Sequence, residues 1–210
     1  MGNDRYTQPD WSRSALLTID MQEDFTRPDA PAYIHGTEEM LENLQDLLSY
    51  FRHKKRPVFH IVRLYRRDGS NVDLCRRASV EQGNQVVAPG TPGAELVHEL
   101  KPDTGISLDH NLLMSGAPQP FSSTEWALFK PRWGAFYQTR LQQMLQKQQV
   151  NTVVIAGCNF PNCPRTTIYE ASERDFKTVL IQDATSGVYK KGIEELKKIG
   201  VSVIKTEELV

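Results

Sequence analysis

Short apolar runs alternate with amphipathic stretches along most of the chain. Six of these runs are predicted to be strands, because each is brief, largely apolar and bounded by polar or turn-forming residues. They occupy residues 14–20, 58–64, 126–129, 152–157, 177–183 and 201–205. The first run, SALLTID, is mostly apolar and ends in an acid, which is typical of a buried parallel strand.

Apolar residues between these runs recur at helical spacing. The clearest stretch is 37–55, where Thr37 is predicted to cap a helix whose apolar residues share one face. Further helices are predicted at 136–148, 163–174 and 188–199. The passage from 65 to 123 is rich in Gly and Pro, with one short helical piece at 93–100. A long irregular passage of this kind usually carries function or an interface.

Strands that alternate with helices predict a parallel sheet covered on both faces, because each right-handed crossover passes over one face of the sheet. The sequence therefore predicts an α/β protein, a three-layer α/β/α Rossmann-like fold. We expect a single domain over residues 1–210, with its core at about 14–205. Ligands of such folds bind at the carboxyl ends of the strands.

Composition narrows the classes of partner. Basic residues number 25 and acidic residues 26, and no segment has a strong excess of basic residues; nucleic acid is therefore not an expected partner. The apolar runs are far shorter than the roughly 20 residues that cross a bilayer, so no membrane span is expected. Three cysteines and a polar amino-terminal segment favour a cytoplasmic protein with reduced thiols.

Three chemically active side chains follow the predicted strands. Asp20 ends the first strand, Lys130 follows the third, and Cys163 follows the fourth. Taken alone, each has a more common structural role, as a cap, a solvated charge or a small core residue. Their expected convergence at one edge of the sheet changes this, because a carboxylate, an ammonium and a thiol together can form an activated nucleophile.

Cys163 begins a predicted helix, where unpaired backbone N–H groups favour an anion. With Lys130 nearby, we expect its thiol pKa to lie below the value of about 8.5 for a free thiol. Asp20 would accept the thiol proton and later pass it to a leaving amine. Backbone N–H groups of the loop GCNFPN could bind the oxyanion of a tetrahedral intermediate.

Three segments resemble the isochorismatase-like cysteine hydrolase superfamily. They are ALLTIDMQEDF at 15–25, FKPRWGAFYQTRLQQML at 129–145 and VVIAGCNFPNCPRTTIYEASERDFKTVLIQDATS at 153–186. The resemblance implies that Asp20, Lys130 and Cys163 are catalytic, and that the sheet has six parallel strands. It also implies a homo-oligomer, a dimer or tetramer, a cis peptide bond between Cys158 and Asn159, and an oxyanion hole made by the N–H groups of Asn159 and Cys163.

A cysteine at position 163 favours one branch of this superfamily. Isochorismatases cleave a vinyl ether without a cysteine nucleophile, whereas the related amidases cleave C–N bonds through a thioester. Among these, nicotinamidases bind a metal through an Asp-x-His pattern with further histidines. Here His60 lies inside a predicted strand and the other histidines are scattered. We therefore predict neither a metal nor another cofactor.

The segment KPRWGAF resembles one in ureidoacrylate and carbamoyl amidohydrolases, which favours a small acyclic ureido or carboxamide substrate. Apolar and aromatic side chains are predicted to form the walls of its site, and polar ones to meet a carboxylate or carbonyl. The first set is Phe25, Trp133, Phe136 and Phe160, and the second is Arg63, Tyr65 and Arg132. Core packing or a surface salt bridge remains the alternative for each of these residues except Phe160, which is expected to form the wall beside the Cys163 sulfur.

Other classes of function stay open. Cys158 and Cys163 could form a thiol redox pair, although four residues separate them and thioredoxin-like motifs have two. A vinyl ether hydrolase and a binding protein that retained the fold without turnover are further alternatives.

Overall fold

The central sheet has seven strands in the order β3-β4-β2-β1-β5-β6-β7. The structure is a computed structural model that describes residues 4–210. Its strands are β1 (Ser14–Ile19), β2 (Val58–Val62), β3 (Gln119–Pro120), β4 (Glu125–Phe129), β5 (Thr152–Gly157), β6 (Lys177–Thr185) and β7 (Ser202–Ile204). The six predicted strands all form and pair in parallel. The seventh, β3, is a short antiparallel edge strand, so the prediction of six strands misses one.

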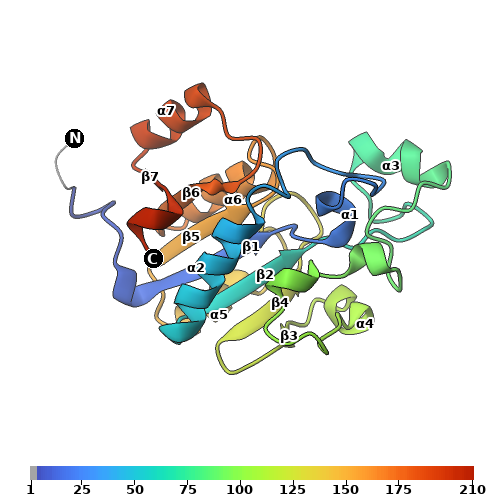
Figure 1. The fold of residues 1–210 in the computed structure, drawn as a ribbon, viewed down its shortest axis with the longest axis horizontal. Coiled ribbons are helices and arrows are strands. Elements are labelled where there is room, and N and C mark those ends of the chain that lie inside the picture. The colour runs from blue at the N-terminus through green and yellow to red at the C-terminus, as the bar shows by residue number, and fades with distance from the viewer. Residues whose placement is uncertain (1–3) are drawn as a thin grey trace.

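Helices cover both faces of the sheet, which confirms the predicted three-layer fold (Figure 1). On one face lies α2 (Leu41–His53), whose residues Leu44, Leu47 and Phe51 are fully buried. The other face is covered by α5 (Leu141–Lys147), α6 (Cys163–Ser172) and α7 (Lys190–Lys198). None of the helices within residues 4–210 is long and apolar enough to span a bilayer.

Two predicted helices begin later than expected. The hydroxyl group of Thr37 donates to the carbonyl of Ile34 at 2.6 Å and does not cap a helix, because α2 begins at Leu41. The helix predicted from residue 136 begins at Leu141. The preceding segment stays in a loop because side chains of α6 hold its backbone: the N–H groups of Ala135 and Phe136 donate to Thr167 and Glu170.

The passage from 65 to 123 contains more structure than predicted. It holds α3 (Leu74–Glu81), α4 (His110–Met114) and strand β3. Two 3-10 helices, Pro92–Ala94 and His98–Leu100, replace the helix predicted at 93–100. Further 3-10 helices span Trp11–Arg13 and Thr206–Glu208. Figure 1 shows α3 and the short α1 (Glu23–Thr26) beyond the ends of β1 and β2, on the side opposite the two termini.

Strand β1 lies between β2 and β5. The order in which successive strands are added to the sheet reverses at this place, and a ligand crevice is expected at the carboxyl ends of these strands. The end of β5 approaches β1 very closely there. A Cβ atom on Gly157 would lie 2.3 Å from the carbonyl oxygen of Ile19, and Gly157 has a φ of 117°. Only glycine satisfies both the dihedral angle and the close approach.

The close contact at Gly157 predicts a large effect of one methyl group. Gly157→Ala is expected to lower the free energy of unfolding by about 3 to 5 kcal/mol, because the β1–β5 backbones must separate. Gly83 is a matched control, since it also has positive φ, at 100°, but no atom lies within 4 Å of the place that a methyl group would occupy. Gly83→Ala should cost about 1 kcal/mol. Equal losses for the two variants in denaturant titrations would contradict the prediction.

Candidate active site

Asp20 and Lys130 are positioned by the same strand. The N–H group of Asp20 donates to the carbonyl of Ile61 at 2.8 Å, and that of Lys130 donates to Val62 at 3.0 Å. Both acceptors belong to β2, which lies between β1 and β4. Sheet hydrogen bonding therefore continues one residue beyond each strand and fixes both side chains at the same edge.

A buried ion pair joins these two residues. Lys130 Nζ lies 2.9 Å from Asp20 Oδ2, and the side chains are 0% and 5% exposed. The other carboxylate oxygen, Oδ1, is buried and accepts no hydrogen bond from residues 4–210. Asp20 itself has a φ of 54°, a left-handed conformation that is uncommon for a residue other than glycine. The pair leaves one oxygen of the carboxylate available to a third group.

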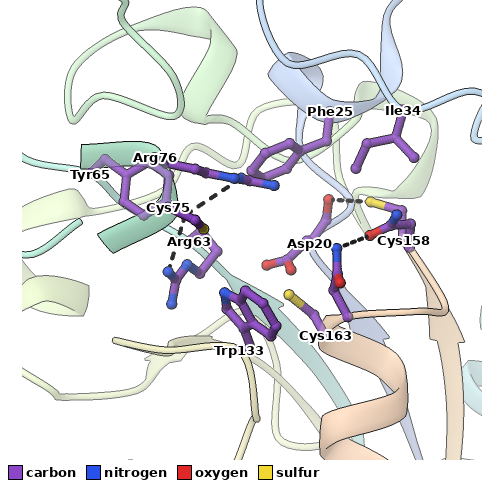
Figure 2. A pocket seen from close by; sticks show the side chains of 12 residues that line it. Asp20, Phe25, Ile34, Arg63, Tyr65, Cys75, Arg76, Trp133, Cys158 and Cys163 are labelled. Carbon is purple, nitrogen blue, oxygen red and sulfur yellow. Dashed lines mark hydrogen bonds between the residues drawn. The ribbon is translucent and has the colours of Figure 1, made fainter. Parts of the chain in front are cut away.

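Cys163 is the third predicted residue, and it faces the same space as the Asp20 carboxylate (Figure 2). It is the first residue of α6, as predicted. Burial and the Asp20 carboxylate raise the pKa of its thiol to about 12, and these effects exceed the opposite influence of Lys130. The predicted lowering of this pKa is therefore wrong, because burial of the thiol and the nearby Asp20 carboxylate outweigh the ammonium group of Lys130.

Cys158 has a different environment from Cys163. It is 1% exposed, and its thiol donates to the backbone carbonyl of Asp20 at 3.1 Å. Burial raises the pKa of this thiol well above its usual value. The peptide bond between Cys158 and Asn159 is cis, as the resemblance implied.

The loop between β5 and α6 presents free backbone donors. The N–H group of Phe160 donates to Ser186 at 2.8 Å, which ties the loop to the end of β6. By contrast, the hydrogen bonds of residues 4–210 include no acceptor for the N–H groups of Asn159 and Cys163. These two donors are available to a ligand beside the Cys163 sulfur.

The pocket above these groups has a volume of about 290 Å³. Most of the predicted site residues line this pocket. Their positions near the ends of the predicted strands are the sequence signal that identifies them. Its lining is Asp20, Phe25, Ile34, Arg63, Tyr65, Cys75, Arg76, Trp133, Cys158, Asn159, Asn162 and Cys163. Lys130 lies beneath the lining, with no exposed surface. Sequence reasoning missed Arg76, because no helix was predicted where α3 forms.

Three predicted substrate-binding residues lie outside the pocket lining. Arg132 faces a separate groove, and its guanidinium donates to the carbonyls of Asn71 and Pro131. Phe160 is fully buried, with its ring centroid 5.4 Å from that of Tyr189. Phe136 packs against Phe176 at 5.7 Å. The last two therefore occupy the core, which was the alternative role of Phe136 and differs from the predicted place of Phe160 in the pocket wall.

Arg63 lines the pocket but its charge is already matched. It forms an ion pair with Asp73, and it also donates to the Tyr65 hydroxyl at 3.1 Å and to the Lys130 carbonyl at 3.2 Å. Tyr65 in turn donates to Asp73 at 2.8 Å. Burial raises the pKa of Tyr65 to about 12, so its hydroxyl stays protonated at neutral pH. This group forms a rigid wall of the pocket.

The donors needed for a bound metal ion do not gather in the described chain. Residues 4–210 contain no group of three His, Cys, Asp or Glu side chains that could hold one. His60 is fully buried in β2, where its ring nitrogens contact Thr18 at 2.8 Å and Glu125 at 2.7 Å. It is the satisfied core histidine that its position in a strand predicted.

Comparisons with known proteins agree with this fold. Among solved structures, an isochorismatase family protein from Desulfovibrio vulgaris superposes with a TM-score of 0.80 at 31% identity, covering 94% of this chain and 96% of its own. A curated "Probable inactive nicotinamidase" of Arabidopsis thaliana is 32% identical over 198 residues, 91% of each chain. A maleamate amidohydrolase of Pseudomonas putida is 28% identical, covering 81% of this chain and 71% of its own.

The family model for the isochorismatase domain matches residues 14–117 and 107–208. These two matches together cover nearly the whole chain, including the three segments from which the resemblance was inferred. Their agreement with the α/β fold confirms that resemblance, and the chain belongs to the isochorismatase family of hydrolases.

Proposed function

We propose that the protein is a cysteine hydrolase that cleaves a C–N bond of a small amide, ureido or carbamoyl compound through a thioester. One observation carries the proposal: the Cys163 thiol shares a pocket with an Asp20 carboxylate that Lys130 holds by one oxygen only. The name of one relative, the maleamate amidohydrolase, supports the same class of bond.

The first step is attack of the Cys163 sulfur on the substrate carbonyl carbon. Because its raised pKa keeps the thiol protonated at rest, the proton must leave as the C–S bond forms. Asp20 Oδ1 is the acceptor, since it is buried and has no other hydrogen-bond partner in residues 4–210. Lys130 keeps the carboxylate fixed during the transfer through its contact with Oδ2.

Negative charge then develops on the carbonyl oxygen. The free N–H groups of Asn159 and Cys163 are donors that this oxyanion can use. The loop that carries them is fixed by the bond from Phe160 to Ser186, so the donors need little rearrangement. A preorganised donor of this kind commonly lowers the activation barrier by about 3 to 4 kcal/mol.

Three proton transfers complete the cycle. Protonated Asp20 donates to the substrate nitrogen, the C–N bond breaks, and ammonia or an amine leaves a thioester on Cys163. Water then attacks the thioester carbon and gives a proton to Asp20, and the departing Cys163 sulfur recovers that proton as the acid is released. One water is consumed and the enzyme returns to its starting state.

The position of Cys158 favours hydrolysis over a redox pair. Its thiol is buried and bonded to the Asp20 carbonyl, so it is held behind the pocket wall. Exchange with another disulfide requires a thiolate, and the pKa values of both thiols are raised. Only Cys163 of the pair is partly exposed.

An ammonia-release assay distinguishes the role of the nucleophile Cys163 from that of the neighbouring Cys158. In a screen of amides, ureido acids and carbamoyl compounds, Cys163→Ala is expected to lower the rate on any active substrate at least about 10³-fold. Cys158→Ala removes a buried thiol that takes no part in the proposed steps, and should retain activity within about tenfold.

Both variants should be compared at equal folded concentration, verified by circular dichroism. Loss of activity in Cys158→Ala as complete as in Cys163→Ala would contradict a hydrolase with one nucleophile. Ammonia release that survives in Cys163→Ala would contradict the assignment of Cys163 as the nucleophile.

The raised thiol pKa predicts how Cys163 reacts with iodoacetamide. Because only the thiolate is alkylated, the rate should rise about tenfold per pH unit from about pH 7, with no plateau below about pH 10. Asp20→Asn removes the negative charge that opposes thiolate formation and leaves Lys130 charged. It should therefore speed alkylation at pH 8 at least about tenfold, while turnover is lost.

These rates require a Cys75→Ser background, because Cys75 is exposed and would react as well. The parent enzyme with Cys75→Ser alone serves as the reference at each pH. A plateau near neutral pH, or slower alkylation in Asp20→Asn, would show that Lys130 has a larger effect than Asp20 on the pKa of the Cys163 thiol.

A further inference from the structure

Arg76 is a pocket residue that the proposed reaction does not use. It lies in the first turn of α3, is half-buried, and lines the same cavity as Asp20 and Cys163. Figure 2 shows its guanidinium extended over that cavity, beside the ring of Phe25. The distance from the guanidinium carbon to the ring centroid is 5.6 Å, a cation–π contact that holds the group in place.

The guanidinium of Arg76 donates almost no hydrogen bonds to the rest of the described chain. Its one hydrogen bond is a long contact of 3.5 Å from Nη1 to the Tyr65 hydroxyl. No carboxylate among residues 4–210 lies within 4 Å of it, whereas Arg63 pairs with Asp73 and Arg77 pairs with Glu81. A planar group with five N–H donors is thus largely unused at the cavity wall.

The charges around the cavity otherwise cancel in pairs. Asp20 is matched by Lys130 at 2.9 Å, so it does not need Arg76 as a partner. Arg63 is matched by Asp73. With the thiol and Tyr65 protonated, Arg76 leaves the cavity with one excess positive charge. An anionic group of a ligand would supply the missing acceptors and neutralise this charge.

We propose that Arg76 binds a carboxylate of the substrate, so that the substrate carries a C–N bond at one end and a carboxylate at the other. This inference rests on the proposed function, because the other end must reach Cys163. The cavity volume of about 290 Å³ lies at the lower end of the range for pockets that bind small ligands, which favours a short substrate. The class is therefore short-chain amic or ureido acids.

The first test compares short amic acids with their diamides, in which a neutral carboxamide replaces the carboxylate. The pairs are malonamate with malonamide, succinamate with succinamide, and glutaramate with glutaramide. For the best pair, wild-type protein should prefer the amic acid in kcat/KM by roughly 10- to 100-fold, mainly through KM, as expected for hydrogen bonds to a charged group.

Arg76→Gln is expected to abolish this preference, because KM for the amic acid should rise much more than KM for the diamide. Arg76→Lys keeps the charge without the planar fork and should retain part of the preference. Arg77→Gln is the matched control, because it makes the same charge change on the next residue, which is exposed and faces Glu81. A preference that survives Arg76→Gln, or an equal loss in Arg77→Gln, would overturn the proposal.

A binding measurement separates this inference from the proposed function. Malonate, succinate and glutarate are titrated calorimetrically into wild-type, Arg76→Gln and Arg77→Gln proteins, each verified as folded by its melting temperature. The tightest of the three should bind roughly 10- to 100-fold more weakly to Arg76→Gln alone.

If dicarboxylates bind through Arg76 but no amide in the panel releases ammonia, the hydrolase proposal fails and the carboxylate site stands. If amic acids and diamides are cleaved equally well and dicarboxylate binding does not depend on Arg76, the carboxylate site fails and the hydrolase proposal stands.

Discussion

The buried ion pair between Asp20 and Lys130 is the interaction on which the rest of the site depends. Desolvating two charges costs several kcal/mol for each ion, and breaking such a pair by removing one partner costs about 3 to 5 kcal/mol. The attraction between the two charges offsets this desolvation cost only when the geometry of the pair is fixed by the surrounding structure. Here β2 fixes it, because its consecutive carbonyls at Ile61 and Val62 hold the backbones of both partners. The architecture of the sheet thus determines where an ionised carboxylate can persist without water.

The pair also determines how the neighbouring thiol behaves. A cation lowers a thiol pKa when its field is uncompensated, but Lys130 is compensated by a carboxylate that itself faces the sulfur. Burial then dominates, and the stable resting form is a neutral thiol beside a free carboxylate oxygen. This resting form differs from that of cysteine enzymes that rest as a thiolate ion pair.

Much of the fold, and the strand ends at which Asp20 and Cys163 come together, could be predicted from the sequence, because they depend on strong local patterns. The apolar runs of β1, β2, β5 and β6 have few alternative structures, and their ends place Asp20 and Cys163. Predictions failed where a distant contact overrides a local pattern. Thr37 looks like a cap, but its hydroxyl serves the carbonyl of Ile34. The segment before Leu141 has helical periodicity, yet α6 holds it as a loop.

Roles of charged residues were the least predictable, since they depend on which charges are already matched in the folded chain. Arg63 was a natural candidate for a substrate anion, but Asp73, ten residues later, occupies its guanidinium. Arg76 and Arg77 are adjacent in sequence, and a helix turns each residue by about 100° from the last. That rotation brings Arg77 to Glu81, one turn away, and directs Arg76 toward the cavity, where no carboxylate of residues 4–210 lies within 4 Å of its guanidinium. The same side chain type is therefore structural at one position and available for a ligand at the next, and only the three-dimensional pairing of charges distinguishes them.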